Sequence, residues 1–497
     1  MINDNRKSLK AVVNNPDKMN NYDNINHLVS YLGSRLADLE KRVDEKDKLN
    51  IDDRLDRLEN IVFLRNIHSF SDLLKLRFGE LARTLKKIVG GINFEDRHFQ
   101  SRLNRLKSLY NQSIHKLDGI GPDNEIFNNC RIYIDITQTL STDTITGISR
   151  VSKELALAAM ELGVVPVFQW GLAFVAYDPV KGDYRKVTIS KDDILFLPDA
   201  SWLSPGLEEV VNSVKNKGGK IAFLLHDIIP VRYPHFCDPY HNRLFTKWLT
   251  EIVFAADCIV SVTESISLDA EKYMDEIEAP VESRPAMRWS HSGVNLSASI
   301  DEDSPHSYLF RIASRPSYLS VGAIEPKKNY TVILDAVEMA WAAGADFNYI
   351  IVGSYGWGQT NLKNRILNHA EYSNRLHWLQ TISDPELVYL YENCHYLIQG
   401  SVTEGFGLPV VEAARCGLSA ICSDIPVLKE ITQGTALYFQ TKDSNQLAKI
   451  IKDTSIQDKI PCPIRPDTWA VSARRTVKIL NGIISPVSAS PKDLSRL

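Results

Sequence analysis

Two carboxylates, Glu404 and Glu412, flank a segment that begins as a glycine-rich loop and continues as a predicted helix. Gly405 and Gly407 permit backbone conformations and close ligand approach that a side chain would block. Pro409 then suits the first turn of a helix, where its missing N–H costs no hydrogen bond. The spacing therefore predicts Glu404 on a loop before a helix N-terminus and Glu412 on the first turns of that helix.

This arrangement points to a ligand that carries both phosphates and hydroxyls. The exposed N–H groups and the dipole of a helix N-terminus favour bound anions, while carboxylates beside it accept hydrogen bonds from hydroxyl groups. A nucleotide sugar is such a ligand. The alternative is a strand-loop-helix junction at which Glu404 and Glu412 are merely solvated, because two acids at a given spacing are common.

With Gly-Phe-Gly-Leu-Pro between the two acids, the segment resembles the retaining glycosyltransferases of the GT-B fold, in the large fourth sequence family. The resemblance implies that Glu404 lies near the hydroxyls of the donor sugar and that Glu412 binds the ribose. The four residues before Glu404 depart from the Pro-Ser and aromatic residue that the family often has there. The backbone expected against the sugar and phosphate belongs to Gly405, Phe406, Gly407 and Leu408.

A second motif, residues 320–329, leaves an apolar run and enters a predicted helix with Lys327 and Lys328 at the turn. A diphosphate needs cationic compensation as it becomes a leaving group, and fixed lysines supply this without a metal. The alternative is a solvated turn. By resemblance, Lys328 is the family's phosphate-binding lysine, and Lys327 replaces a frequent arginine. Ala323 stands where many relatives carry an arginine.

A third motif begins at His226, directly after the apolar run 221–225. Polar residues at the carboxyl end of a buried parallel strand face a ligand site. By resemblance to the family's His-Asp-x-x-Pro element, His226 approaches the reacting sugar and the acceptor, where it orients them and stabilises charge. Asp227, on the acceptor side, is expected to fix the tautomer of His226. The alternative is a hydrogen-bonded core histidine.

Two glycine loops complete the candidate site. Gly147 opens a predicted helix after the first strand, and its loop resembles the family's loop that meets the diphosphate or the acceptor. Arg150, on that helix, either contacts phosphate or an anionic acceptor, or lies at the surface. Gly353 begins a loop that resembles the family's loop near the nucleotide base. There, Trp357 either contacts the base or packs.

The 497 residues suffice for two or three domains. Continuous apolar runs separated by helices predict parallel sheets covered on both faces, hence an α/β protein with two doubly wound domains and a ligand cleft between them. The predicted divisions are a helical, coiled-coil-like region 1–125, an N-terminal Rossmann-like acceptor-side domain 126–303, a C-terminal Rossmann-like nucleotide-sugar domain 304–484 whose last helix crosses back, and a flexible tail 485–497.

An apolar stripe runs along the N-terminal region at alternating spacings of four and three, the pattern of a coiled-coil seam. It comprises Ile25, Val29, Leu32, Leu36, Leu39 and Val43. Burying it requires another helix, from this chain or another copy. A helical hairpin and a self-associating coiled coil through residues 25–88 are both open, and we favour self-association. A chain starting near residue 125 is then expected to keep the chemistry and to lose oligomerisation or membrane recruitment.

Composition excludes several classes of partner. A net charge of −4 gives no electrostatic case for nucleic acid. The seven cysteines lack paired spacing, which favours reduced thiols in the cytoplasm. The polar N-terminus does not resemble a signal peptide, and no apolar stretch is long enough to span a bilayer. At most, peripheral association with the inner face of the cell membrane is expected. No Asp-x-Asp stands at a predicted strand end, so we expect neither a metal nor a cofactor.

The family resemblance covers about residues 130–483. It implies a retaining, metal-independent hexosyltransferase in bacterial surface polysaccharide synthesis, such as O-antigen or capsule assembly. The expected partners are a nucleotide-diphosphate sugar, with GDP-mannose first, and a glycan or polyprenyl-diphosphate-linked acceptor. Two alternatives are a coiled-coil assembly protein with a non-catalytic GT-B module and a nucleotide-sugar epimerase of the same fold.

Overall fold

The computed structural model describes residues 97–114, 131–141, 146–179, 181–295, 307–313 and 315–484. The chain divides into two units, residues 1–91 and 92–497, and the described residues all belong to the second. The predicted coiled coil through residues 25–88 and the tail from residue 485 lie outside the described residues.

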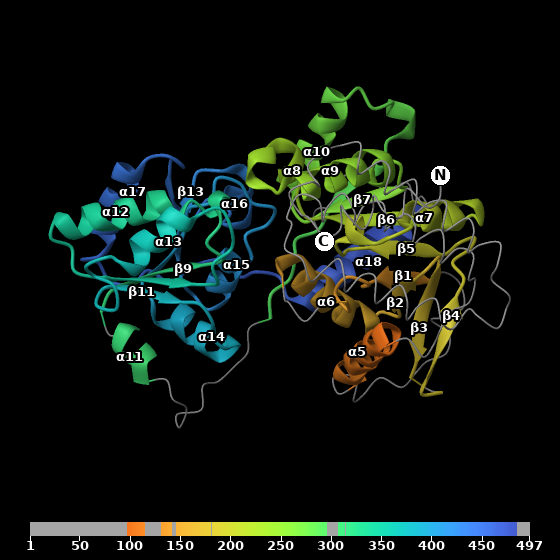
Figure 1. The fold of residues 1–497 in the computed structure, drawn as a ribbon, viewed down its shortest axis with the longest axis horizontal. Coiled ribbons are helices and arrows are strands. Elements are labelled where there is room, and N and C mark those ends of the chain that lie inside the picture. The colour runs from red at the N-terminus through yellow and green to blue at the C-terminus, as the bar shows by residue number, and fades with distance from the viewer. Residues whose placement is uncertain are drawn as a thin grey trace, which may run out of the picture. The chain divides into compact units, whose positions relative to one another are not determined.

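The first domain contains an eight-stranded sheet of order β4-β3-β2-β1-β5-β6-β7-β8 within the described ranges (Figure 1). From β2 to β8 neighbouring strands are parallel, and β3 and β4 join antiparallel at one edge. The strands are β1 (Ile132–Asp135), β2 (Val165–Trp170), β3 (Ala173–Asp178), β4 (Asp183–Val187), β5 (Ile194–Leu197), β6 (Lys220–Leu225), β7 (Cys258–Ser261) and β8 (Ala286–Trp289). The α-helices of this domain are α5 (Arg97–Ile114), α6 (Gly147–Met160), α7 (Leu207–Asn216), α8 (Ile229–Arg232), α9 (Pro239–Lys247) and α10 (Glu264–Glu276).

The second domain contains a six-stranded, wholly parallel sheet of order β11-β10-β9-β12-β13-β14. Its strands are β9 (Ser317–Val321), β10 (Asn348–Val352), β11 (Leu376–Leu379), β12 (Tyr396–Gln399), β13 (Ala420–Ser423) and β14 (Leu437–Phe439). The helices in this part of the chain are α11 (Ser307–Ala313), α12 (Tyr330–Ala342), α13 (Thr360–Leu367), α14 (Asp384–Asn393), α15 (Leu408–Arg415), α16 (Pro426–Ile431), α17 (Ser444–Thr454) and α18 (Trp469–Ile484).

Both sheets are doubly wound, as the apolar runs predicted. The strand order reverses between β1 and β5 in the first sheet and between β9 and β12 in the second. In such sheets, ligands bind outside the carboxyl ends of the strands at the reversal. The candidate residues that follow β6, β9 and β12 therefore lie at the ligand-binding edges of their sheets.

The apolar runs 131–136, 193–197, 220–225 and 258–262 predicted β1, β5, β6 and β7, whereas β2, β8 and the antiparallel edge of β3 and β4 were not predicted. The antiparallel edge contains a tight turn. There, Gly171 and Leu172 form a two-residue turn between β2 and β3, and Gly171 has a φ of 60°. A two-residue turn with positive φ is typical of a β-hairpin. Strand β4 is polar and mostly exposed, so it has no continuous apolar run from which a strand could be predicted.

Helix α5, which we assigned to the N-terminal helical region, packs against the first sheet and α6. Its Phe99 is fully buried, and the ring lies 5.6, 5.1 and 5.4 Å from the rings of Phe168, Trp170 and Tyr184. Leu103, Leu106, Leu109 and Tyr110 of the same helix are also buried. Helix α5 therefore contributes to the core of the first domain.

Because α5 belongs to this core, a stable truncated protein must begin before α5, at about residue 92, and not at residue 125 as we expected. Each buried side chain of α5 contributes about 1.5–3 kcal/mol, and a whole domain is stable by only about 5–15 kcal/mol. A chain that begins at residue 126 should therefore aggregate or melt at a much lower temperature. A chain that begins at residue 92 keeps α5 and should melt at a clearly higher temperature than the shorter chain. Thermal melting of both chains tests this, and equal melting temperatures would contradict a core role for α5.

The last helix, α18, returns to the first domain and packs against α6, β6 and β7. Two connections between the domains therefore lie near each other, one after β8 and one before α18. The N–H of Val294 in the first connection donates to the carbonyl oxygen of Asp467 in the second, at 2.9 Å. The two connections are thus hydrogen-bonded to each other.

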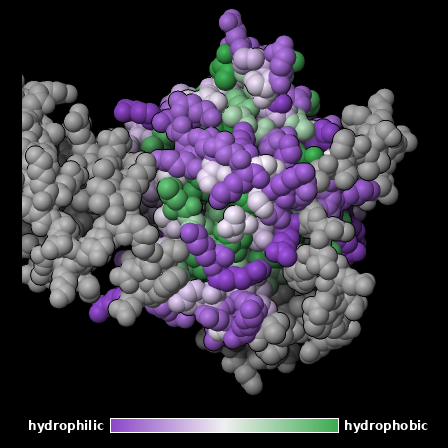
Figure 2. Space-filling model, turned by 90° about the vertical axis from the view of Figure 1, so that its right-hand side faces the viewer, coloured by the Kyte–Doolittle hydropathy of each residue, from purple (hydrophilic) through white to green (hydrophobic). Residues whose placement is uncertain are grey.

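None of the helices in the described ranges has the length and hydrophobicity needed to span a lipid bilayer. Figure 2 shows one face of the molecule, on which hydrophilic residues cover most of the coloured surface and hydrophobic residues gather in a small central area. The coloured part of this face is mainly polar.

Candidate active site

The loop between β12 and α15 has the predicted form. Helix α15 begins at Leu408, with Pro409 in its first turn and Gly407 at the N-cap. Gly407 has a φ of 88°, in the left-handed region that glycine adopts without steric cost. Glu404 thus lies on the loop and Glu412 on the helix, as predicted.

Glu404 is buried and accepts three hydrogen bonds at one oxygen. Its Oε1 lies 2.6 Å from Lys328 Nζ, 2.6 Å from Ser401 Oγ and 2.7 Å from Gln399 Nε2. Burial raises the pKa of Glu404, but the ammonium groups of Lys328 and Lys327 and the hydrogen bonds outweigh it, so the pKa is lowered overall. Glu404 is therefore an anion at neutral pH.

The lysine turn that follows β9 is bonded to the loop that carries Glu404. The carbonyl oxygen of Lys327 accepts the N–H of Val402 at 2.9 Å. The side-chain amide of Asn329 donates to the carbonyl oxygens of Gly400, at 3.1 Å, and Thr441, at 2.6 Å. Burial lowers the pKa of Lys327, but Asp227, Glu404 and Glu325 outweigh it and raise the pKa. Both ammonium groups thus stand beside a fixed carboxylate.

The carboxylate of Glu412 contacts one side chain from each domain. Its Oε1 pairs with Arg150 Nη1 at 2.7 Å, and its Oε2 accepts the hydroxyl of Tyr391 at 2.9 Å. Burial raises the pKa of Glu412, and the charge of Arg150 partly offsets this. Arg150 is therefore more than a surface residue: its side chain, one-third exposed, connects α6 to the acid on α15.

The side chain of His226 is fixed by the backbone. Its Nε2 donates to the carbonyl oxygen of Pro198 at 2.7 Å, so Nε2 carries a hydrogen. Burial lowers the pKa of His226, which favours the neutral ring with Nδ1 as an acceptor. Asp227 does not make this hydrogen bond, contrary to our expectation. Its Oδ1 accepts the N–H of Ile229 at 2.9 Å, at the start of α8.

The backbone of the Glu404 loop touches the first domain. A Cβ on Gly405 would lie 2.1 Å from the carbonyl oxygen of His226, so no side chain fits there. The Thr263 hydroxyl donates to the carbonyl oxygen of Gly405 at 3.2 Å. A Cβ on Gly147 would lie 4.0 Å from Leu408 Cδ1. His226, Gly147 and the loop 404–408 are thus brought together.

The last predicted residues lie around this centre. A Cβ on Gly353, which has a φ of 143°, would lie 2.3 Å from the carbonyl oxygen of Gly322, so this glycine permits close packing of the ends of β9 and β10. Trp357 is 41% exposed. The ring of Phe406 is buried and lies 5.8 Å from that of His291, so its side chain packs within the protein.

Sequence reasoning missed the side chains that hold the two acids: Gln399, Ser401 and Tyr391. Gln399 and Ser401 lie close to Glu404 in sequence, but no spacing rule marked them. In the described part of the chain, no group of three or more His, Cys, Asp and Glu side chains is arranged to hold a metal ion.

Most of the second domain matches the model of a known protein family. Residues 310–461 match the family model described as "Glycosyl transferases group 1". This range includes Lys327, Lys328, Glu404 and Glu412.

Two curated bacterial proteins are similar to this chain. A serotype-specific mannosyltransferase WbdA of Escherichia coli is 32% identical over 387 residues, which cover 72% of this chain and 47% of that protein. The O-antigen chain mannosyltransferase RfbU of Salmonella typhimurium is 26% identical over 238 residues, covering 46% of this chain and 59% of RfbU. The chain spans about half the length of the relatives it matches.

Among solved structures, the sucrose-phosphate synthase of Thermosynechococcus elongatus matches with a TM-score of 0.50 and 15% identity, covering 72% of this chain and 100% of that chain. At this identity the likeness shows the fold alone. The expected GT-B fold of two Rossmann-like domains is confirmed for the described residues, and the coiled-coil region lies outside them.

Proposed function

We propose that the protein is a retaining glycosyltransferase that moves a hexose from a nucleotide-diphosphate sugar to a glycan or polyprenyl-diphosphate-linked acceptor. The observation that carries this proposal is the buried Glu404 beside Lys328, on the loop that leads into α15. The matched group 1 domain and the mannosyltransferase names of the relatives support it.

In this proposal the second domain binds the donor. All three hydrogen bonds from the described residues to Glu404 meet Oε1, which leaves Oε2 for the hydroxyls of the sugar. The ribose hydroxyls donate to Glu412, since each carboxylate oxygen accepts two hydrogen bonds. The diphosphate lies against the N-terminal amides of α15 and the two lysines.

Breaking the bond between sugar and diphosphate places negative charge on the departing phosphate. The ammonium group of Lys328 is held by Glu404, and the backbone of Lys327 is bonded to the Glu404 loop. Both lysines therefore stabilise the charge with little reorganisation of the site. His226, neutral with an accepting Nδ1, orients a hydroxyl of the sugar or the acceptor. The acceptor hydroxyl enters from the first domain, where Asp227 and Arg150 lie. Its oxygen bonds to the anomeric carbon on the face that the diphosphate leaves, and its proton passes to the departing phosphate oxygen.

GDP-mannose is the first candidate donor, because the relatives are named as mannosyltransferases and as O-antigen enzymes. The proposed setting is surface-polysaccharide assembly at the cytoplasmic face of the membrane.

A thermal-shift screen with UDP- and GDP-sugars, followed by analysis of the products, tests this function. A donor at a hundredfold excess over its Kd stabilises the protein by roughly 2.7 kcal/mol. We expect GDP-mannose to raise the melting temperature, and mannose to reach an oligomannose acceptor with the α-configuration retained. Turnover should persist in excess EDTA, because the lysines occupy the role of a metal.

Three other outcomes would contradict the proposal. Conversion of the donor to another sugar without an acceptor indicates an epimerase. Binding without turnover of any donor indicates a non-catalytic module. Loss of activity in EDTA with rescue by magnesium or manganese contradicts the metal-free assignment.

A further inference from the structure

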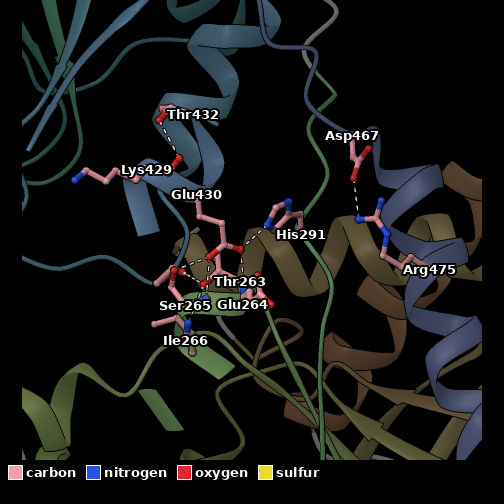
Figure 3. Close-up of polar contacts among 11 residues, drawn as sticks. Thr263, Glu264, Ser265, Ile266, His291, Lys429, Glu430, Thr432, Asp467 and Arg475 are labelled. Carbon is pink, nitrogen blue, oxygen red and sulfur yellow. Dashed lines mark hydrogen bonds and ion pairs between the residues drawn. The ribbon is translucent and has the colours of Figure 1, made fainter. Parts of the chain in front are cut away.

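Glu430, on α16 of the second domain, reaches the N-terminus of α10 in the first domain (Figure 3). Its Oε1 accepts the backbone N–H of Glu264 at 2.8 Å, and its Oε2 accepts the backbone N–H of Ser265 at 2.8 Å. The Ser265 hydroxyl donates to Oε2 at 2.6 Å. These first-turn amides have no partner within their own helix, so a carboxylate from the other domain satisfies them.

The same carboxylate holds the connection between the domains. His291 Nε2 donates to Glu430 Oε1 at 2.7 Å. The carbonyl oxygen of His291 accepts the Ser472 hydroxyl at 2.7 Å, which ties it to α18. A Cβ on Gly293 would lie 2.4 Å from Trp469 backbone atoms, so the two connections are in close contact there. His291 is thus held on both sides.

The turn at the start of α10 also contacts the candidate active site. The N-cap of α10 is Thr263, whose hydroxyl also donates to the carbonyl oxygen of Gly405. Gly405 follows Glu404 and lies against the carbonyl oxygen of His226. The turn that Glu430 binds is therefore the turn that holds the Glu404 loop beside His226.

The contacts made by Glu430 exist only while the two domains are together. Its side chain is 16% exposed. Burial raises the pKa of Glu430, but the hydrogen bonds from His291, Ser265 and the α10 amides outweigh this, so the pKa is lowered overall. Hydrogen bonds to a charged acceptor are about twice as strong as neutral ones. In a separated state the carboxylate, the two amides and the imidazole would all return to water.

We propose that Glu430 is a positioning residue that holds the second domain closed on the first and thereby sets the Glu404 loop against His226. Its effect on turnover rests on the proposed glycosyl transfer, whereas the contact itself does not.

Hydrogen exchange of the protein without substrate tests the contact. The amides of Glu264 and Ser265 should be protected in the wild type, although amides at a helix N-terminus normally exchange quickly. Glu430→Ala should remove this protection, and Glu430→Gln, which keeps one acceptor oxygen, should remove part of it. Lys429→Ala is the matched control, because Lys429 pairs with Asp424 inside the second domain. Unprotected amides in the wild type would overturn the proposal.

Steady-state kinetics and calorimetry test the positioning role. Glu430→Ala should lower kcat about tenfold or more, because a displacement of about 1 Å in reacting groups has effects of up to a hundredfold. The donor Kd should change less than twofold, since the donor binds the second domain. Lys429→Ala should change neither value.

The two proposals fail in different ways. A wild-type protein that makes no product from any donor, yet shows the protected amides, contradicts glycosyl transfer and leaves the interdomain contact established. Lost protection in Glu430→Ala with an unchanged kcat overturns the positioning role. A similar loss of kcat in His291→Ala would support it, since that variant removes another hydrogen bond that holds the Glu430 carboxylate.

Discussion

Replacing Lys328 by alanine is expected to lower kcat about 10²–10³-fold, the effect of removing one fixed group that stabilises charge in a transition state. The donor Kd should change much less, because charge on the leaving diphosphate grows as the bond breaks and is small in the ground state. A variant with unchanged kcat and a weakened Kd would place Lys328 in ground-state binding only.

The same variant should also shift the pH dependence of turnover. Burial raises the pKa of Glu404, and Lys328 is the first of the charges that lower it. Without Lys328, the carboxyl group of Glu404 loses its proton at a higher pH, so the acidic limb of the pH–rate profile should move upward. Lys452→Ala, an exposed lysine on α17 of the same domain, is the control and should leave both kcat and the profile unchanged.

The core strands were predictable because buried parallel strands are continuous apolar runs. In the second domain, the apolar runs 318–321, 347–352, 376–379 and 396–398 match β9, β10, β11 and β12 to within one residue at each end. The antiparallel edge strand β4 is polar and so had no such run. Helix α5 was grouped with the predicted N-terminal helices because its apolar positions recur at a similar helical spacing. Such periodicity shows that a helix face is buried, but it does not show which part of the protein buries it.

The candidate site was predictable where one short segment fixes its geometry. Glu404, Gly407 and Glu412 belong to one loop and helix, so their positions followed from local rules. The pairs Arg150–Glu412 and Glu430–Ser265 join residues that are far apart in sequence, on different domains. Such contacts depend on how two folded domains meet, and no spacing in one chain segment encodes that.

Replacing Glu412 by alanine is expected to weaken donor binding by about 1.5–3 kcal/mol for each charge-assisted hydrogen bond to the ribose that is lost, or roughly tenfold to a hundredfold in Kd. Calorimetry with the nucleoside diphosphate measures this without an acceptor. Because the alanine also leaves the buried hydroxyl of Tyr391 without its partner, Glu412→Gln should be measured beside it. Glutamine keeps an acceptor for Tyr391 and removes the charge.

The Arg150→Ala variant distinguishes two roles for Glu412, which are connecting the two domains and binding ribose. If Glu412 mainly connects the two domains, Arg150→Ala should weaken donor binding as much as Glu412→Ala does. If Glu412 binds ribose, Arg150→Ala should have the smaller effect, because the acid remains in place. The double variant should then match Glu412→Ala alone, since residues in direct contact are not additive. We expect Arg150→Ala to have the smaller effect. Glu412 lies on α15, and its own helix and the hydroxyl of Tyr391 hold its carboxylate in place without Arg150.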